Sequence, residues 1–91
     1  MKKIAVIDDD QDIVDALDLL LKIKGYNVVT ASNIRDGLNL IETEKPDLIF
    51  LDVMMDEPDD GFYLAMKLRS KGVQTPIVLL TSVSKSTGLD F

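Results

Sequence analysis

The chain has no cysteine, no histidine and no tryptophan among its 91 residues, and only three prolines. The absence of cysteine excludes disulfides, thiolate metal sites and cysteine nucleophiles. The absence of histidine removes the commonest general base and the commonest metal ligand of proteins. A metal site in this protein would therefore be built from oxygen ligands.

Long apolar runs and excess positive charge are missing as well. No apolar run approaches the ~18 residues that span a bilayer, and the apolar start meets Asp8 too soon for a signal peptide. The formal net charge of −6 argues against a nucleic-acid-binding surface and against adsorption to an anionic membrane. We therefore expect a cytoplasmic protein with neither nucleic acid nor membrane as a partner.

The size and composition predict one folded domain. Ninety-one residues support a single hydrophobic core, and 46% hydrophobic with 29% charged residues is typical of folded chains. We expect this domain to span residues 1–91, with residues 83–91 forming a loop after the last strand.

Four short apolar runs recur along the chain, at residues 4–7, 28–31, 48–51 and 77–80. Three of them are apolar at every position, as strands buried on both faces of a parallel sheet require. The stretches between them show helical spacing of apolar residues. The three stripes are Ile13, Leu17, Leu20 and Leu21; Ile34, Leu38 and Ile41; and Phe62, Ala65 and Leu68. This alternation predicts an α/β fold with a doubly wound parallel sheet.

Residues at the ends of the expected helices fit this assignment. Asp10 can cap the first helix, Ser32 the second, and Asp59 or Asp60 the third. Gly25 and Gly72 follow the first and third helices, where a left-handed conformation is common.

Acidic residues stand at the ends of two expected strands. Of the 16 acidic residues 13 are aspartates, and Asp8, Asp9 and Asp52 follow or end the first and third runs. Ligands of open parallel sheets bind beyond the carboxyl ends of the strands, so the three carboxylates converge if these strands are neighbours. Two carboxylates about 4 Å apart repel by roughly 4 kcal/mol at an effective dielectric constant of ~20. Such a cluster favours a bound cation, Mg²⁺ or as a substitute Mn²⁺.

A Mg²⁺ ion held by a few carboxylates is the usual partner of a phosphoryl group. Asp52 is the most plausible nucleophile in a chain without cysteine or histidine, and Thr81 offers a hydroxyl at the end of the fourth run. Taken singly, Asp8 and Asp9 could simply complement a helix dipole, and Asp52 could be a turn residue. Their matched positions favour a shared site.

Several motifs in order resemble the receiver domains of two-component response regulators. They are Ile-Asp-Asp-Asp at 7–10, Asp-Leu-Ile-Phe-Leu-Asp-Val-Met-Met at 47–55, Asp-Gly-Phe at 60–62 and Pro-Ile-Val-Leu-Leu-Thr-Ser at 76–82. The resemblance runs from residue 2 to about residue 82. It implies a flavodoxin-like (CheY-like) sheet with strand order 2-1-3-4-5.

The resemblance also implies a function and a set of site residues. Asp52 would accept a phosphoryl group from a sensor histidine kinase or phosphotransfer protein and thereby switch an output. Asp8 and Asp9 would bind Mg²⁺ together with Asp52 and the backbone carbonyl of Met54, and Thr81 would be the switch hydroxyl. The domain would be a regulatory phospho-acceptor that assists its own phosphotransfer and dephosphorylation, and not an enzyme.

The sequence departs from the family pattern in two places. The family usually reads Asp-x-x-x-Pro-x-x-Asp-Gly after the acceptor, whereas here Pro58 comes two places late and Gly61 one place late. The second departure is that the 91 residues end before the family's fourth helix, fifth strand and fifth helix, so its phosphoryl-binding lysine is not among them. We expect either a fragment of a longer protein or a truncated receiver, and Lys85 is expected to be a solvated loop residue. An unpaired, apolar fourth strand would favour pairing with a second copy of the chain.

Two alternative functions stay open. A pseudo-receiver that is never phosphorylated would share the fold, and the missing lysine favours it. A phosphatase with an aspartate nucleophile would carry a second aspartate two residues after the first, where this chain has Met54. Mg²⁺ binding distinguishes the pseudo-receiver from the receiver and the phosphatase, because only the receiver and the phosphatase need the metal.

Overall fold

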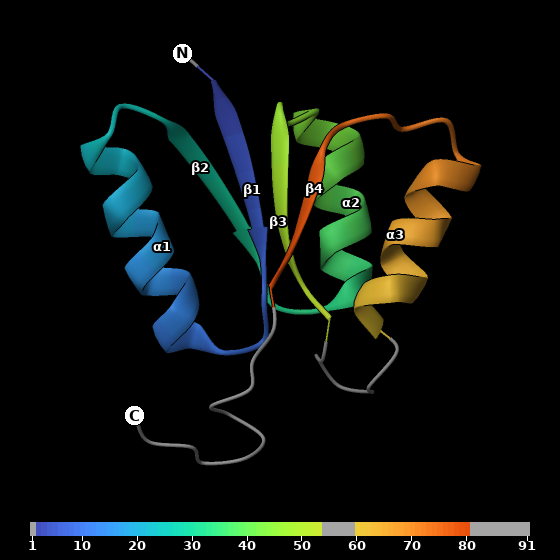
Figure 1. Ribbon diagram of the computed structural model, residues 1–91, viewed down its shortest axis with the longest axis horizontal. Helices are drawn as coiled ribbons and strands as arrows, with labels where there is room; N and C mark the ends of the chain where they lie inside the picture. Colours follow the sequence, from blue (N-terminus) through green and yellow to red (C-terminus); the bar gives the residue numbers. More distant parts are fainter. Residues whose placement is uncertain (1, 54–59, 81–91) are drawn as a thin grey trace.

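Strands and helices alternate along the chain (Figure 1). The computed structural model describes residues 2–53 and 60–80. Their elements are β1 (Lys3–Ile7), α1 (Gln11–Ile23), β2 (Asn27–Ala31), α2 (Ile34–Glu44), β3 (Leu48–Asp52), α3 (Asp60–Ser70) and β4 (Ile77–Leu80).

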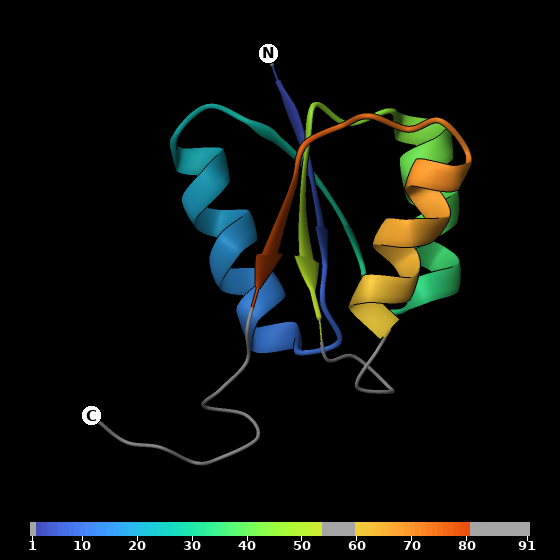
Figure 2. The same cartoon turned by 45° about the vertical axis from the view of Figure 1, so that its right-hand side comes forward.

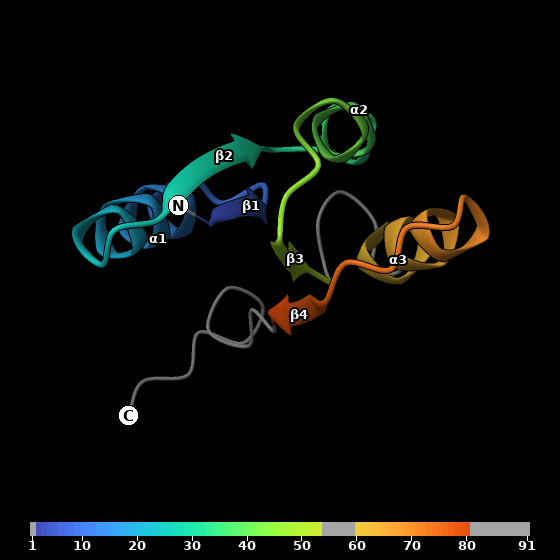
Figure 3. The same cartoon turned by 90° about the horizontal axis from the view of Figure 1, so that it is seen from above.

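The strands form one parallel sheet in the order β2-β1-β3-β4. Helix α1 covers one face of this sheet, and α2 and α3 cover the other (Figure 3). The order changes direction between β1 and β3, because the chain winds from β1 to β2 and then returns past β1 to β3. The predicted doubly wound α/β fold is therefore confirmed, as are the neighbouring positions of the first and third strands.

Successive residues of β1 supply two separate hydrophobic clusters, since alternate side chains of a strand point to opposite faces. On the α1 face, Ile4 and Val6 pack with Val14 and Leu21. On the other face the cluster of buried residues comes from β1, β3, α2 and α3. Its members are Ala5, Ile7, Ile41, Ile49, Leu51, Leu64 and Leu68.

Two predicted apolar stripes are partly wrong. In α1 the buried side chains are Val14 and Leu21, whereas Leu20 is 51% exposed. In α3 the fully buried side chains are Leu64 and Leu68, whereas Phe62 is 55% exposed and Ala65 only partly buried. Residues four apart lie one above the other on a helix, so Leu64 and Leu68 define the buried side. The predicted stripe began two residues too early because Phe62 is itself apolar.

Helix ends follow the capping rules with one correction. The Asp10 carboxylate accepts hydrogen bonds from the backbone N–H groups of Asp12 and Ile13, at 3.0 and 3.4 Å, so this predicted cap is confirmed. The cap of α2 is Asn33, and the prediction of Ser32 was wrong by one residue. Gly25 and Gly72 have the expected positive φ, at 94° and 86°. Asp59 lies outside the described residues.

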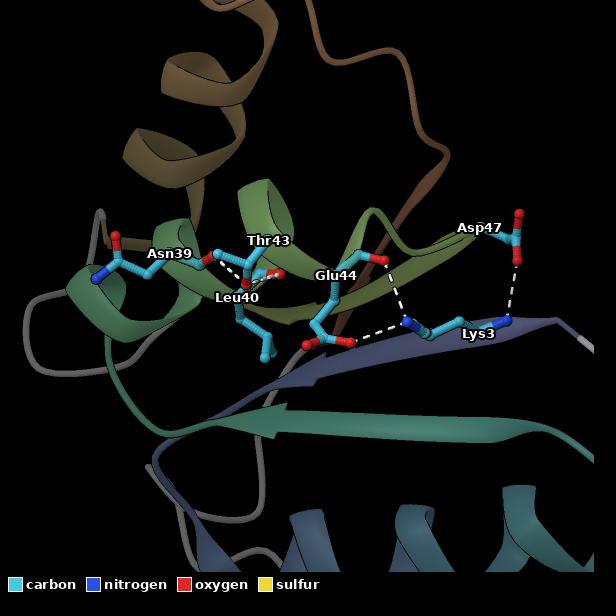
Figure 4. Close-up of polar contacts among 6 residues, drawn as sticks. All are labelled: Lys3, Asn39, Leu40, Thr43, Glu44 and Asp47. Atoms are coloured by element: carbon cyan, nitrogen blue, oxygen red, sulfur yellow. Dashed lines mark hydrogen bonds and ion pairs between the residues drawn. The ribbon is translucent and has the colours of Figure 1, made fainter.

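At the amino ends of the strands, Lys3 ties β1 to the end of α2 and the start of β3 (Figure 4). Its Nζ donates to Glu44 Oε1 at 2.8 Å, and its backbone N–H donates to Asp47 Oδ2 at 2.9 Å. Within α2 itself, the Thr43 hydroxyl donates to the Asn39 carbonyl at 2.8 Å (Figure 4). These polar contacts lie at the opposite end of the sheet from the aspartates.

Candidate functional site

Three aspartates meet at the carboxyl ends of β1 and β3. Asp8 and Asp9 follow β1, and Asp52 is the last residue of β3. One carboxylate oxygen of each lies within 4.8 Å of the other two. The structure thus brings together the three residues that the sequence placed at neighbouring strand ends, while their chemical roles stay predictions.

Asp8 is held by backbone groups on both sides. Its N–H donates to the Ala31 carbonyl at the end of β2, at 3.1 Å. Its Oδ1 accepts the N–H of Asp10 at 2.9 Å, just before α1 begins. The residue is fully buried. Because the turn from β1 into α1 fixes both its backbone and its carboxylate, Asp8 is a rigid part of the site.

Asp52 is buried to the same extent, between two other strands. It pairs in register with Leu80 of β4, and the next N–H, that of Val53, donates to the Leu80 carbonyl at 3.2 Å. Asp9, in contrast, is exposed. The cluster therefore has two buried carboxylates and one that faces solvent, so an ion or phosphoryl group can approach from the Asp9 side.

The donor set suits a hard divalent cation. All three donors are carboxylate oxygens, which Mg²⁺ prefers. Two oxygens bound to one Mg²⁺ lie about 3–4 Å apart, since each Mg–O distance is about 2.1 Å. Oxygens within 4.8 Å of one another need only small side-chain rotations to reach that spacing. A bound cation would also offset the mutual repulsion of the carboxylates, which burial strengthens.

Two predicted site residues, Met54 and Thr81, lie outside the described residues, and so does the departure at Pro58. Their roles stay predictions. Gly61 is a residue whose contribution the sequence reasoning missed, because it entered only as part of a displaced motif. The signal available in the sequence was the Asp-Gly-Phe motif at 60–62, which places this glycine at the second position of α3.

Residues 4–89 match the sequence profile of the response regulator receiver domain. The chain belongs to this family. It is therefore a receiver domain of the two-component response regulators, as its motifs suggested. Within the described residues, none of the helices combines the length and the apolar character needed to cross a membrane.

Curated relatives support the same assignment. The chain is 46% identical over 81 residues to the alkaline phosphatase synthesis transcriptional regulatory protein PhoP of Bacillus subtilis (strain 168), an overlap covering 89% of this chain and 33% of PhoP. Relatives from Mycolicibacterium vanbaalenii and Streptomyces coelicolor match over 39% and 36% of their lengths. The receiver chain thus spans between a third and two fifths of the length of these relatives.

Solved structures of receivers share the fold. The response regulator TrrA of Thermotoga maritima, in complex with Mg²⁺-BeF, is similar with a TM-score of 0.82 and 33% identity, over 97% of this chain and 76% of that one. TrrA in complex with the histidine kinase ThkA matches with a TM-score of 0.81 and 34% identity, over 92% of this chain and 72% of that one.

Proposed function

We propose that this receiver takes a phosphoryl group from a histidine kinase or phosphotransfer protein onto Asp52, in the presence of Mg²⁺, and thereby switches an output. The observation that carries the proposal is the cluster itself. Asp52 is buried at the end of β3, with oxygens of Asp8 and Asp9 within 4.8 Å. A nucleophilic carboxylate beside a cation site is the arrangement that phosphoryl transfer to aspartate needs.

Asp8, Asp9 and Asp52 would hold the ion, with the backbone carbonyl of Met54 as a further ligand and Mn²⁺ as a possible substitute. When bound, the metal offsets the negative charge of the phosphoryl oxygens. The protein's own contribution is to keep the carboxylates in place. Asp8 is fixed through its contacts to Ala31 and Asp10.

The transfer itself exchanges one bond to phosphorus for another. A carboxylate oxygen of Asp52 attacks the phosphorus of a phosphohistidine, and an O–P bond forms as the N–P bond breaks. The electron pair of the N–P bond stays on the imidazole nitrogen. The products are an aspartyl phosphate on the receiver and a free histidine on the kinase. Thr81 would donate its hydroxyl to the phosphoryl group as the switch residue.

The relatives suggest the partner and the output. A related regulator, TrrA, has been solved with the histidine kinase ThkA. Two of the relatives are named transcriptional regulatory proteins, so we propose transcription as the class of output. We further propose a cytoplasmic domain that acts as a regulatory phospho-acceptor and not as an enzyme, and that does not itself bind nucleic acid, in keeping with its net charge of −6.

A pseudo-receiver and an aspartate-nucleophile phosphatase are the competing functions. The converging carboxylates favour a metal-dependent receiver over a pseudo-receiver, which has no need to hold them together. Met54 argues against the phosphatase, because it stands where that mechanism uses a second aspartate as the general acid.

Phosphorylation of Asp52 can be tested directly. We expect acetyl phosphate and Mg²⁺ to add one phosphoryl group to the protein, located on Asp52 by mass spectrometry. Asp52→Asn, which keeps the shape of the side chain, should abolish the adduct. Asp18→Asn is the matched control, because Asp18 pairs with Lys22 on the surface of α1 and should label normally.

Each competing function has its own outcome in this experiment. A pseudo-receiver would bind no Mg²⁺ and take up no phosphoryl group. A phosphatase would release many equivalents of inorganic phosphate per chain. Equal labelling of the wild-type protein and Asp52→Asn would falsify the assignment of the acceptor.

A further inference from the structure

The first turn of α3 lies directly against the backbone that carries Asp52. Gly61, the second residue of α3, is buried, and its N–H donates to the Val53 carbonyl at 3.3 Å. Figure 2 shows the start of α3 beside the carboxyl end of β3. The residue that follows Asp52, Val53, is thus hydrogen-bonded to the second residue of α3.

This contact leaves no room for a side chain. A Cβ atom at Gly61 would lie 2.3 Å from Val53 Cα and 2.4 Å from the Asp52 carbonyl oxygen. Real Cβ atoms do not approach other atoms so closely. Both neighbours are backbone atoms, which cannot rotate away as the end of a side chain can. Gly61 does not have the positive φ of Gly25 and Gly72, so the requirement for glycine is one of space.

The backbone at Asp52 cannot retreat freely from such an atom. On its other side it is paired with β4, where the Val53 N–H donates to the Leu80 carbonyl at 3.2 Å. A side chain at residue 61 would therefore push α3 outward or push the end of β3 out of register. In the second case Asp52 moves relative to Asp8, which is anchored independently at the ends of β1 and β2.

We propose that Gly61 is a positioning residue: by having no side chain, it lets α3 hold Asp52 at the distance from Asp8 and Asp9 that a divalent cation and phosphoryl transfer require. This inference rests on the proposed function. Mg²⁺ demands near-ideal octahedral geometry, so a small displacement of one carboxylate lowers affinity. A misplacement of about 1 Å can also cost on the order of 100-fold in rate.

Gly37 offers a matched comparison within the same chain. It also lies in a helix and is buried, and a Cβ there would meet Ile7 Cδ1 and Cγ2 at 3.1 Å and Leu64 Cδ2 at 3.4 Å. These contacts are with the ends of side chains, which can shift by a few tenths of an ångström. Both glycine-to-alanine changes add one methyl group within a helix. They differ in whether the methyl group meets backbone or side chain.

The test compares Gly61→Ala with Gly37→Ala in two measurements. The first needs no metal: amide resonances in ¹⁵N–¹H spectra should shift at Asp52 and Val53 in Gly61→Ala and stay in place in Gly37→Ala. The second is titration with Mg²⁺, in which Gly61→Ala should bind about tenfold or more weakly, as other changes to the support of a metal site do. Gly37→Ala should bind as the wild type does.

A third variant separates positioning from mere loss of stability. Leu68→Ala removes a fully buried side chain from the far end of α3, and should lower the stability by about 2–5 kcal/mol. Folded Leu68→Ala should keep the wild-type Mg²⁺ affinity. The positioning role would be overturned if the Asp52 and Val53 resonances did not move in Gly61→Ala. It would also be overturned if Leu68→Ala weakened Mg²⁺ binding as much as Gly61→Ala does. A wild-type protein that binds no Mg²⁺ would instead refute the proposed function, and the metal-free spectra would still decide the role of Gly61.

Should Gly61→Ala fail to fold, hydrogen exchange of the wild-type protein tests the same inference. If the contact of Gly61 with Val53 holds Asp52 in its binding position, then by linkage Mg²⁺ must in turn stabilise that contact. We expect Mg²⁺ to slow exchange of the Gly61 N–H, and to leave that of Gly72, which donates to Arg69 at the far end of α3, unchanged. Equal effects at both amides would contradict the proposal.

Discussion

Three consecutive aspartates in this receiver have three different surroundings. Asp8 is buried and bonded to the backbone at Asp10, Asp9 is exposed beside the cluster, and the Asp10 carboxylate caps α1. The turn from β1 into α1 produces this division, because each step along the chain turns the next side chain in another direction. The same substitution at each of the three aspartates is therefore expected to have a different effect.

At the residue scale, Asp9→Ala should change the Mg²⁺ affinity, whereas Asp10→Ala should change the stability of the fold. Asp9→Ala should weaken Mg²⁺ binding by about tenfold or more and hardly change stability, because the exposed carboxylate belongs to the metal cluster. Asp10→Ala should keep the Mg²⁺ affinity but lower the free energy of unfolding by about 1 kcal/mol, because it removes the cap. Metal titration and urea denaturation of both variants measure the two quantities, and the reverse order of affinities would refute the assignment.

At the scale of the element, the first residue of α2 depends on which of two neighbouring side chains caps the helix. Ser32 and Asn33 are both good capping types. It is the side-chain Oδ1 of Asn33 that accepts the Asp36 N–H, at 2.8 Å, and the side-chain Nδ2 of Asn33 donates to the Asp36 carboxylate at 3.0 Å. The reciprocal pair satisfies the helix terminus and binds the first acidic residue of α2.

We expect Asn33→Ala to lower the free energy of unfolding by about 1 kcal/mol, because the Asp36 N–H loses its partner. Ser32→Ala is the matched control one residue away and should cost much less. Urea denaturation with a common slope for both variants measures the difference. A larger loss in Ser32→Ala would mean that Ser32 is the cap in solution.

For the whole molecule, the fourth strand is the feature with the widest consequence. Within residues 2–53 and 60–80, β4 is paired on one side only, at the outer edge of the sheet (Figure 2). Its two central residues point to opposite faces and are both exposed, Val78 at 41% and Leu79 at 42%. An apolar edge strand is a template for pairing with another chain.

We therefore expect this chain to associate with a second copy through β4, so that light scattering shows a mass that rises with concentration. Val78→Lys should shift the equilibrium toward the monomer, because a charged side chain on an edge strand opposes pairing. Leu19→Lys is the control: Leu19 is 64% exposed on α1, away from that edge, and its change should leave association unaltered. A wild-type chain that stays monomeric at all concentrations would contradict this expectation.

The linear sequence determined the features of this protein that depend on local periodicity and on the ends of strands. Apolar runs separated by amphipathic stretches require a parallel α/β sheet, and in such a sheet the aspartates after β1 and β3 share one edge. Tertiary structure decided which side of α3 is buried: this helix turns Leu64 and not Phe62 to the core, although both are apolar. It also decided the role of Gly61, because the closeness of α3 to the Asp52 backbone is a contact between elements that no local pattern records.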